Sequence, residues 1–195
     1  MTDGTYDMII LCLHHRIAVQ MVQEALPKIP AGTILVDTCG LKGRMVRDLT
    51  YRCQKAGVRY VGTHPMAGRE KNGYYASIPD LFQNANLIVT PVDGTDEAAL
   101  DTVKELAKQM GFGKIVTATP MWHDNMIAYT SQLAHVVSSS YVKDFCMDDA
   151  LSFSGGSFQD MTRVATMDES MWALLFLDNR DNLLYHLDLL IENLT

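Results

Sequence analysis

Short apolar runs alternate with helical periods over the first 120 residues. Near-continuous apolar runs, typical of buried strands, occupy 6–13, 32–40, 58–64, 86–91 and 114–120. Apolar residues at helical spacing predict helices over 15–29, 41–57 and 95–111, the last with Thr95 as its N-cap. Because strands and helices alternate and the strands are apolar throughout, we predict a largely parallel sheet covered by helices.

The pattern changes after Pro120, where helical periods dominate and no run favours a strand. Near the C-terminus, several apolar residues fall on one helical stripe: Leu183, Leu184, Leu187, Leu190, Ile191 and Leu194. We therefore predict an α/β domain over 1–120 and an all-helical domain over 121–195.

Charge divides the chain at the same point. The net charge is −7; residues 1–120 carry 13 Lys and Arg against 12 Asp and Glu, whereas residues 121–195 carry 3 against 11. Nucleic acid is not an expected partner, because phosphate binding needs a basic stripe. Half of the basic residues lie between Lys42 and Lys71. This leaves two interpretations open: a small anionic ligand near the segment, or a solvated basic face.

Other sequence features argue against a membrane, secreted or metal-binding protein. No apolar run reaches the roughly 18–20 residues of a membrane span, and the first residues lack the basic and apolar regions of a signal peptide. The four cysteines form no C-x-x-C pair, and no histidine pair has metal-ligand spacing. We expect a cytoplasmic protein with reduced thiols, no membrane contact and no metal.

Candidate chemistry begins with THPMAGREKNG (63–73), which follows a predicted strand. Ligands bind beyond the carboxyl ends of strands in open α/β sheets. His64 is well placed there as a general base, because an unperturbed imidazole titrates at about pH 6.5. Glu70 is near enough in sequence to line the same pocket. The alternative is a histidine that only bonds a turn.

Two further segments offer cations to a ligand. DTCGLKG (37–43) ends another predicted strand, and its Lys42 could meet an anion; the alternative is a tight turn with a solvated lysine. SGGSFQDMTRVA (154–165) carries Arg163, whose fork suits a carboxylate; the alternative is an ion pair with a nearby acid. By position, His135 and Trp172 are most simply core residues.

One motif of dinucleotide-binding proteins is absent. Such a sheet opens with a strand, a G-x-G-x-x-G turn and a helix. This sequence contains no such glycine spacing. The residues by themselves therefore indicate an α/β domain and a helical domain, with no assigned cofactor.

Five segments together resemble the prephenate dehydrogenase family of tyrosine biosynthesis. In chain order they are DTCGLKG, YVGTHPMAGREKNG, NLIVTP, HDNMIAYTSQLAH and GGSFQDMTRVATMDESMW. The resemblance implies an oxidoreductase that performs NAD(P)-dependent oxidative decarboxylation of prephenate to 4-hydroxyphenylpyruvate. It also implies a truncated Rossmann-like α/β domain, which lacks the N-terminal glycine-rich half. A helical dimerisation domain and a homodimer are implied as well.

The same resemblance implies site residues. His64 resembles the residue that bonds the substrate hydroxyl and assists its deprotonation. Arg163 resembles the arginine that binds a substrate carboxylate. With this resemblance, we favour carboxylate binding by Arg163 over the ion pair with a nearby acid. Positions that match residues of the substrate pocket are Glu70, His135, Gly156, Trp172 and Lys42. Gly40 and Thr63 are candidates for the cofactor side. NAD or NADP as cofactor, and prephenate or arogenate as substrate, stay open.

The sequence also departs from the family pattern. Relatives usually carry serine where Gly40 stands and histidine where Gln132 stands, and the glycine turn that holds the pyrophosphate is missing. We therefore expect poor NAD(P) binding by this chain. Two alternatives to an active dehydrogenase stay open: a non-catalytic relative that binds an aromatic keto acid, and a dimerisation module.

Overall fold

The computed structural model describes residues 6–69 and 73–195. The chain divides into two compact units, Met1–His123 and Asp124–Thr195. The division falls within helix α4 (Pro120–Ile127), so His123 belongs to the first unit and Asp124 to the second.

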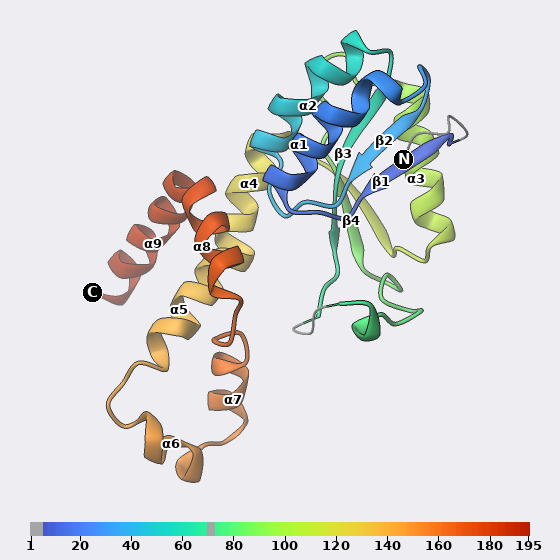
Figure 1. The fold of residues 1–195 in the computed structure, drawn as a ribbon. Coiled ribbons are helices and arrows are strands. Elements are labelled where there is room, and N and C mark those ends of the chain that lie inside the picture. Colours follow the sequence, from blue (N-terminus) through green and yellow to red (C-terminus); the bar gives the residue numbers. More distant parts are fainter. Residues whose placement is uncertain (1–5, 70–72) are drawn as a thin grey trace. The chain divides into compact units, whose positions relative to one another are not determined.

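A five-stranded sheet forms the centre of the first unit (Figure 1). Its strands, in sheet order, are β1 (Met8–Leu11), β2 (Ile34–Asp37), β3 (Arg59–Met66), β4 (Asn86–Val89) and β5 (Lys114–Thr117). Neighbouring strands are parallel except for β3 and β4, which are antiparallel. The prediction of a largely parallel sheet is confirmed with this exception. In the described part of the link between β3 and β4, the one helical element is the 3₁₀ turn η2 (Tyr74–Ala76), whereas each parallel pair of strands is joined through an α-helix.

Strand β3 extends two residues beyond the predicted end at His64. Pairing with β2 stops at Gly62, but pairing with β4 continues through Pro65 and Met66. His64 therefore lies inside β3, opposite Ile88 of β4, rather than after the strand. It still lies beyond the last residue that β3 pairs with the parallel strand β2, which is where ligands bind in open sheets.

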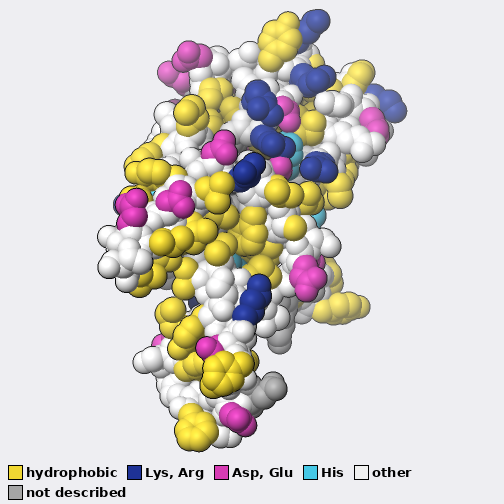
Figure 2. All heavy atoms as spheres, turned by 90° about the vertical axis from the view of Figure 1, so that its left-hand side faces the viewer, with side chains coloured by type: hydrophobic (Ala, Val, Ile, Leu, Met, Phe, Trp, Pro, Cys, Tyr) yellow, Lys and Arg dark blue, Asp and Glu magenta, His cyan; other side chains and the backbone are white. Residues whose placement is uncertain are grey.

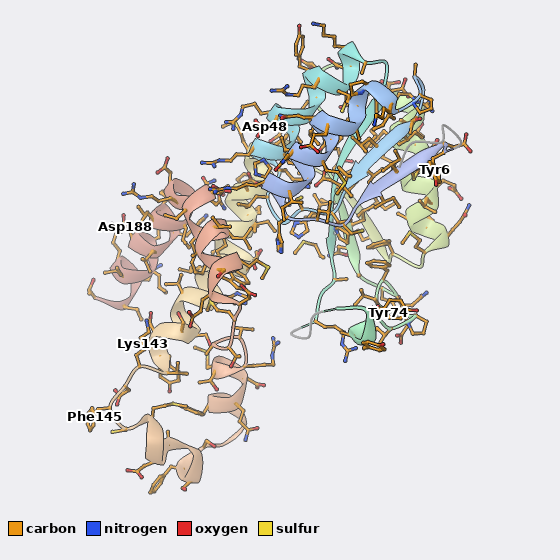
Figure 3. All side chains as sticks on the ribbon, in the orientation of Figure 1. Tyr6, Asp48, Tyr74, Lys143, Phe145 and Asp188 are labelled. Carbon is orange, nitrogen blue, oxygen red and sulfur yellow. The ribbon has the colours of Figure 1, made fainter. Side chains whose placement is uncertain are left out.

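Helices cover both faces of the sheet. α1 (His15–Ala25) and α2 (Gly43–Lys55) lie on one face and α3 (Glu97–Gln109) on the other (Figure 1). Strand β2 serves both layers because its side chains alternate: Leu35 packs with α1 and α2, whereas Val36 packs with α3. On the first face, His15 of α1 bonds Asp48 of α2 at 3.1 Å (Figure 3 labels Asp48).

Asp96, not Thr95, is the N-cap of α3. The Asp96 carboxylate accepts a hydrogen bond from the amide of Ala99 at 2.7 Å. The hydroxyl of Thr95 instead accepts from the amide of Val92 at 2.9 Å and so closes the preceding turn. Both residue types are good caps, so the sequence prediction was displaced by one position.

Helix α2 carries a row of exposed basic side chains. They are Arg44, Arg47, Arg52 and Lys55. In the view of Figure 2, most of the visible Lys and Arg side chains cluster in the upper part of the face. These four side chains are exposed, as on a solvated face, whereas Lys42 at the start of the helix is buried.

The second unit is helical, as predicted. α4 continues through a π-helical turn, η3 (Ala128–Gln132), into α5 (Leu133–Tyr141). The remaining helices are α6 (Met147–Phe153), α7 (Gly156–Thr162), α8 (Glu169–Asp178) and α9 (Arg180–Leu194). Ala128, Leu133 and Leu183 form its buried core.

The apolar stripe of α9 is only partly used within this chain. Leu183 is buried, and Leu187 and Leu190 pack against the same core. The other three residues predicted on the stripe are exposed: Leu184 at 41%, Ile191 at 51% and Leu194 at 78%. The stripe is therefore wider than the face that the second unit buries.

Three observations on the described residues bear on cofactors and location. No group of three His, Cys, Asp or Glu side chains among them is placed to hold a metal ion. None of the helices described is both long and apolar enough to cross a bilayer. All four cysteines are free thiols.

Candidate active site

A buried polar cluster surrounds Asp37 at the end of β2. The Asp37 carboxylate accepts hydrogen bonds from the amide of Cys39 at 2.9 Å and from the hydroxyl of Tyr60 at 2.7 Å, and it pairs with the ammonium of Lys42. Its main-chain carbonyl accepts from the hydroxyl of Thr63 at 2.5 Å. Burial and the Asp37 carboxylate raise the pKa of Tyr60 well above its usual 10. The cluster ties the ends of β2 and β3 together.

Lys42 lies inside this cluster. Its side chain is 0% exposed, and its ammonium donates to Asp37 and, at 2.6 Å, to the carbonyl of Thr63. The sequence left open a solvated lysine or one that meets a ligand anion. The solvated alternative is wrong: the turn directs the side chain inward, where the anion that it meets is Asp37. Buried charges need this kind of pairing and hydrogen bonding.

The two residues expected on the cofactor side also flank the cluster. Gly40 lies in the turn between β2 and α2, two positions before Lys42. Thr63 is 2% exposed, with its hydroxyl and its carbonyl both bonded within the cluster. The structure therefore brings Gly40, Thr63 and Lys42 together at the strand ends, beside His64.

His64 is partly buried and has a second histidine as its partner. Its Nδ1 lies 2.9 Å from Nε2 of His123, and the ring centroids are 5.1 Å apart at an interplanar angle of 63°. Burial, the His123 ring and the Lys42 charge lower the pKa of His64 from its usual 6.5 to about 3. This pKa is lower than the unperturbed value expected from the sequence. At neutral pH this imidazole is instead neutral, so one ring nitrogen keeps a lone pair.

His123 is absent from the sequence-derived site. It is 1% exposed and lies in the first turn of α4, which follows β5. The signal that could have found it is the pair His123–Asp124 directly after a predicted strand, since strand ends collect ligand-binding side chains. Because 59 residues separate His123 from His64, the local sequence does not indicate that the two side chains are in contact.

Cys39 is not a candidate nucleophile. Its thiol is buried and donates to the carbonyl of Leu13 at 3.2 Å. Burial and the Asp37 charge raise the pKa of this thiol to about 12. Because the thiolate is the reactive form, Cys39 is unreactive at neutral pH.

In the second unit the structure brings His135 and Trp172 together. The rings stack with centroids 3.7 Å apart at 28°, and Nδ1 of His135 donates to the carbonyl of Ser131 at 2.9 Å. Both side chains are only partly buried, so they are accessible rather than sealed in the core. The bond to a carbonyl requires a proton on Nδ1, which leaves Nε2 of a neutral His135 as an acceptor.

The other expected residues of the second unit lie at the ends of α7. Gly156 is its first residue, and Arg163 follows its last; both are exposed. Glu70 lies outside the described residues, so its expected place in the pocket is not tested.

Gln132, which stands where relatives usually carry histidine, has a structural explanation. It is 1% exposed at the end of the π-helical turn. Its amide donates to the carbonyl of Leu175 at 2.9 Å, and its oxygen accepts from Asn179 at 2.9 Å. Asn179 in turn donates to the carbonyl of Asp124 at 2.8 Å. The glutamine thus completes a buried polar network.

The fold and these clusters define a protein with a nucleotide-binding type of α/β unit and a helical unit. The model of the prephenate dehydrogenase nucleotide-binding domain matches residues 3–117, and that of the prephenate dehydrogenase dimerization domain matches residues 119–195. The chain belongs to the prephenate dehydrogenase family.

Individual relatives agree. The chain is 32% identical to the prephenate dehydrogenase of Bacillus subtilis over 160 residues, 80% of this chain and 43% of that protein. It is 32% identical to the cyclohexadienyl dehydrogenase of Zymomonas mobilis over 196 residues, 96% of this chain and 65% of that protein. It therefore spans 43% and 65% of the lengths of these two relatives.

A solved structure is similar over nearly the whole chain. Prephenate dehydrogenase from A. aeolicus, in complex with hydroxyphenyl propionate and NAD+, superposes with a TM-score of 0.81 at 28% identity. The match covers 96% of this chain and 66% of that chain. The Rossmann-like α/β domain and the helical domain expected from the sequence are thus shared with a known dehydrogenase.

Proposed function

We propose that this chain carries the substrate-handling residues of a prephenate dehydrogenase. The reaction is NAD(P)-dependent oxidative decarboxylation of prephenate, or of arogenate, in tyrosine biosynthesis. The observation that carries the proposal is His64: a neutral imidazole at the strand ends, held by a second histidine. A neutral imidazole can accept the proton of the substrate hydroxyl, which favours departure of hydride from the same carbon.

Arg163 supplies the charge that a dicarboxylate substrate needs. It is exposed at the end of α7 and is one of three basic residues after position 120. Its guanidinium can bind a carboxylate with two parallel hydrogen bonds. We assign His135, Trp172 and Gly156 to substrate binding with it.

Three residues have a less direct place in the proposal. Glu70 is assigned to substrate binding by resemblance. Lys42 supports the site indirectly: its buried ion pair with Asp37 holds together the strand ends beside His64. Gly40 and Thr63 border the same turn and remain the candidates for the cofactor side. We also propose that the chain consists of two domains, an α/β domain over 1–120 and a helical domain over 121–195.

The cofactor is a nicotinamide dinucleotide, NAD or NADP. NAD+ in the A. aeolicus structure supports this class. The residues of this chain do not fit the pyrophosphate, however: the turn from β1 to α1 contains no glycine and the one from β2 to α2 lacks the G-x-G-x-x-G spacing. The proposed roles of His64 and Arg163 therefore concern the proton of the substrate hydroxyl and the substrate carboxylate, and not the binding of the cofactor.

We further propose a cytoplasmic homodimer. The match to a dimerization domain over 119–195 supports self-association. So do the exposed Leu184, Ile191 and Leu194 of α9, because apolar side chains of this size gain free energy when a partner covers them. Free thiols are typical of a reducing compartment.

A second candidate function is binding of an aromatic keto acid without redox chemistry. Gly40, which stands where relatives usually carry serine, favours it. Mixing the chain with prephenate and NAD+ separates the two functions. NADH formation supports the dehydrogenase, whereas binding of prephenate without NADH supports the binding protein.

Calorimetry with prephenate and with 4-hydroxyphenylpyruvate tests the proposal. We expect binding to the native chain and at least tenfold weaker binding to Arg163→Ala, because a charged hydrogen bond contributes about 1.5–3 kcal/mol. Arg180→Ala removes an exposed arginine of α9 and is the matched control, for which we expect no change. Equal affinity in Arg163→Ala, or no binding to the native chain, contradicts the proposal.

A further inference from the structure

Two histidines of the first unit share a single hydrogen bond. Nδ1 of His64 and Nε2 of His123 lie 2.9 Å apart. His123 is 1% exposed, so water does not replace this contact. A hydrogen bond between two imidazole nitrogens needs a proton on one and a lone pair on the other.

Both rings are held by the backbone on which they lie. His64 is inside β3, opposite Ile88 of β4. His123 is in the first turn of α4, where its amide bonds the carbonyl of Thr119 at 2.9 Å and the hydroxyl of Thr119 accepts from the amide of Trp122 at 3.2 Å. The contact is therefore built into a strand and a capped helix start.

The surroundings disfavour a second proton on His64. Among the described residues, the ammonium of Lys42 lies near enough to act on His64, and it pairs with Asp37, the last residue of β2. Burial, His123 and Lys42 lower the pKa of His64 to about 3. At neutral pH His64 therefore carries one proton, on Nδ1 or on Nε2.

The two arrangements differ in what His64 can do. With the proton on Nδ1, His64 donates to His123, and its Nε2 keeps a lone pair. With the proton on Nε2, the lone pair of Nδ1 is used by His123, and His64 can only donate to a ligand. Only the first arrangement lets His64 accept a proton.

We propose that His123 is a positioning residue that accepts the Nδ1 proton of His64 and so keeps Nε2 of His64 free to take the proton of a substrate hydroxyl. The inference rests on the proposed function in assigning that proton to His64. His123 carries its own proton on Nδ1 and touches no substrate. It acts through the orientation and tautomer of the neighbouring ring.

Nitrogen-15 NMR of the ligand-free chain, labelled at histidine, tests the tautomer directly. We expect His64 to show a protonated Nδ1 and an unprotonated Nε2 in the native chain. His123→Gln places an amide oxygen where an acceptor is needed and should keep this pattern. His123→Phe keeps a ring but removes the acceptor, so His64 should lose its preference for Nδ1.

The controls keep the inference separate from folding and from the proposed function. Amide spectra of β3 and β4 report whether each variant is folded. If His123→Phe does not fold, the tautomer of His64 in the native chain still decides whether the inference holds. A native His64 protonated on Nε2, or an unchanged tautomer in folded His123→Phe, overturns the inference. Because no ligand is present, failure of substrate binding in calorimetry would leave this result standing.

Discussion

The Lys42 ammonium and the Asp37 carboxylate form an ion pair in which both side chains are fully buried. The Tyr60 hydroxyl donates to Oδ2 of Asp37, and the Cys39 amide donates to Oδ1, the oxygen that Lys42 contacts. Lys42 also donates to the carbonyl of Thr63. The pair closes the turn from β2 to α2 against the strand that carries His64. It is a structural element of the candidate site.

Lys42→Met should strongly destabilise the first unit. The change leaves the Asp37 carboxylate buried without its cation, and breaking a buried pair costs about 3–5 kcal/mol. Urea unfolding measures the loss. Lys55→Met removes an exposed lysine from the other end of α2 and should change stability little; equal effects of the two variants would show that the buried pair is not a structural element.

Stability should fall in acid because of His64. The folded pKa is about 3 and the unfolded value is 6.5, so below pH 6.5 the unfolded chain binds the proton more readily than the folded chain. The contribution is complete above pH 6.5 and is lost toward pH 3, by at most about 1.4 kcal/mol per pH unit. We expect His64→Asn to flatten the decline of unfolding free energy between pH 7 and 4, and His14→Asn, at an exposed position, to leave it unchanged. If the unfolding free energies of the native chain and of His64→Asn fall in parallel with decreasing pH, the prediction is wrong.

Gly62→Ala should destabilise the strand that leads to His64. A Cβ at this position would lie 2.7 Å from Oγ1 of Thr90 and 3.0 Å from Cγ2 of Val46. Overpacking of this kind costs about 1–3 kcal/mol. Gly68→Ala is the matched control, because a Cβ there meets none of the described residues within 4 Å. Thermal unfolding compares the two, and a neutral Gly62→Ala would argue against the tight packing at this point.

Gln132→Leu should destabilise the second unit. It removes the bond to the carbonyl of Leu175, which keeps only the Asn179 backbone amide, and it leaves one side-chain N–H of Asn179 without its acceptor. A buried unsatisfied polar group costs about 1–3 kcal/mol. Gln159→Leu changes an exposed glutamine of α7 and should have little effect. If both variants unfold at the same urea concentration, the network is not a stabilising feature.

Most helices and strands could be predicted because burial imposes a local period on the sequence. The antiparallel pairing of β3 and β4 could not, since strand direction depends on how the connecting segment returns to the sheet. This pairing is also why β3 continues through Pro65 and Met66. The N-cap of α3 was displaced by one residue because Thr95 and Asp96 are both suitable caps.

The candidate site was only partly predictable for a similar reason. His64 was identifiable from its place after an apolar run. Its partner His123 was not, because 59 residues separate them and only the folded sheet brings them together. For Lys42, the sequence shows Asp37 five residues earlier but does not show that both side chains turn inward.

The most direct test of substrate binding at His64 is a titration of the histidine-labelled chain with 4-hydroxyphenylpyruvate, followed by nitrogen-15 NMR. We expect the ring signals of His64 to shift and saturate, whereas those of exposed His14 stay in place. Saturable binding that leaves His64 unmoved, or shifts His14 as much as His64, would contradict the account.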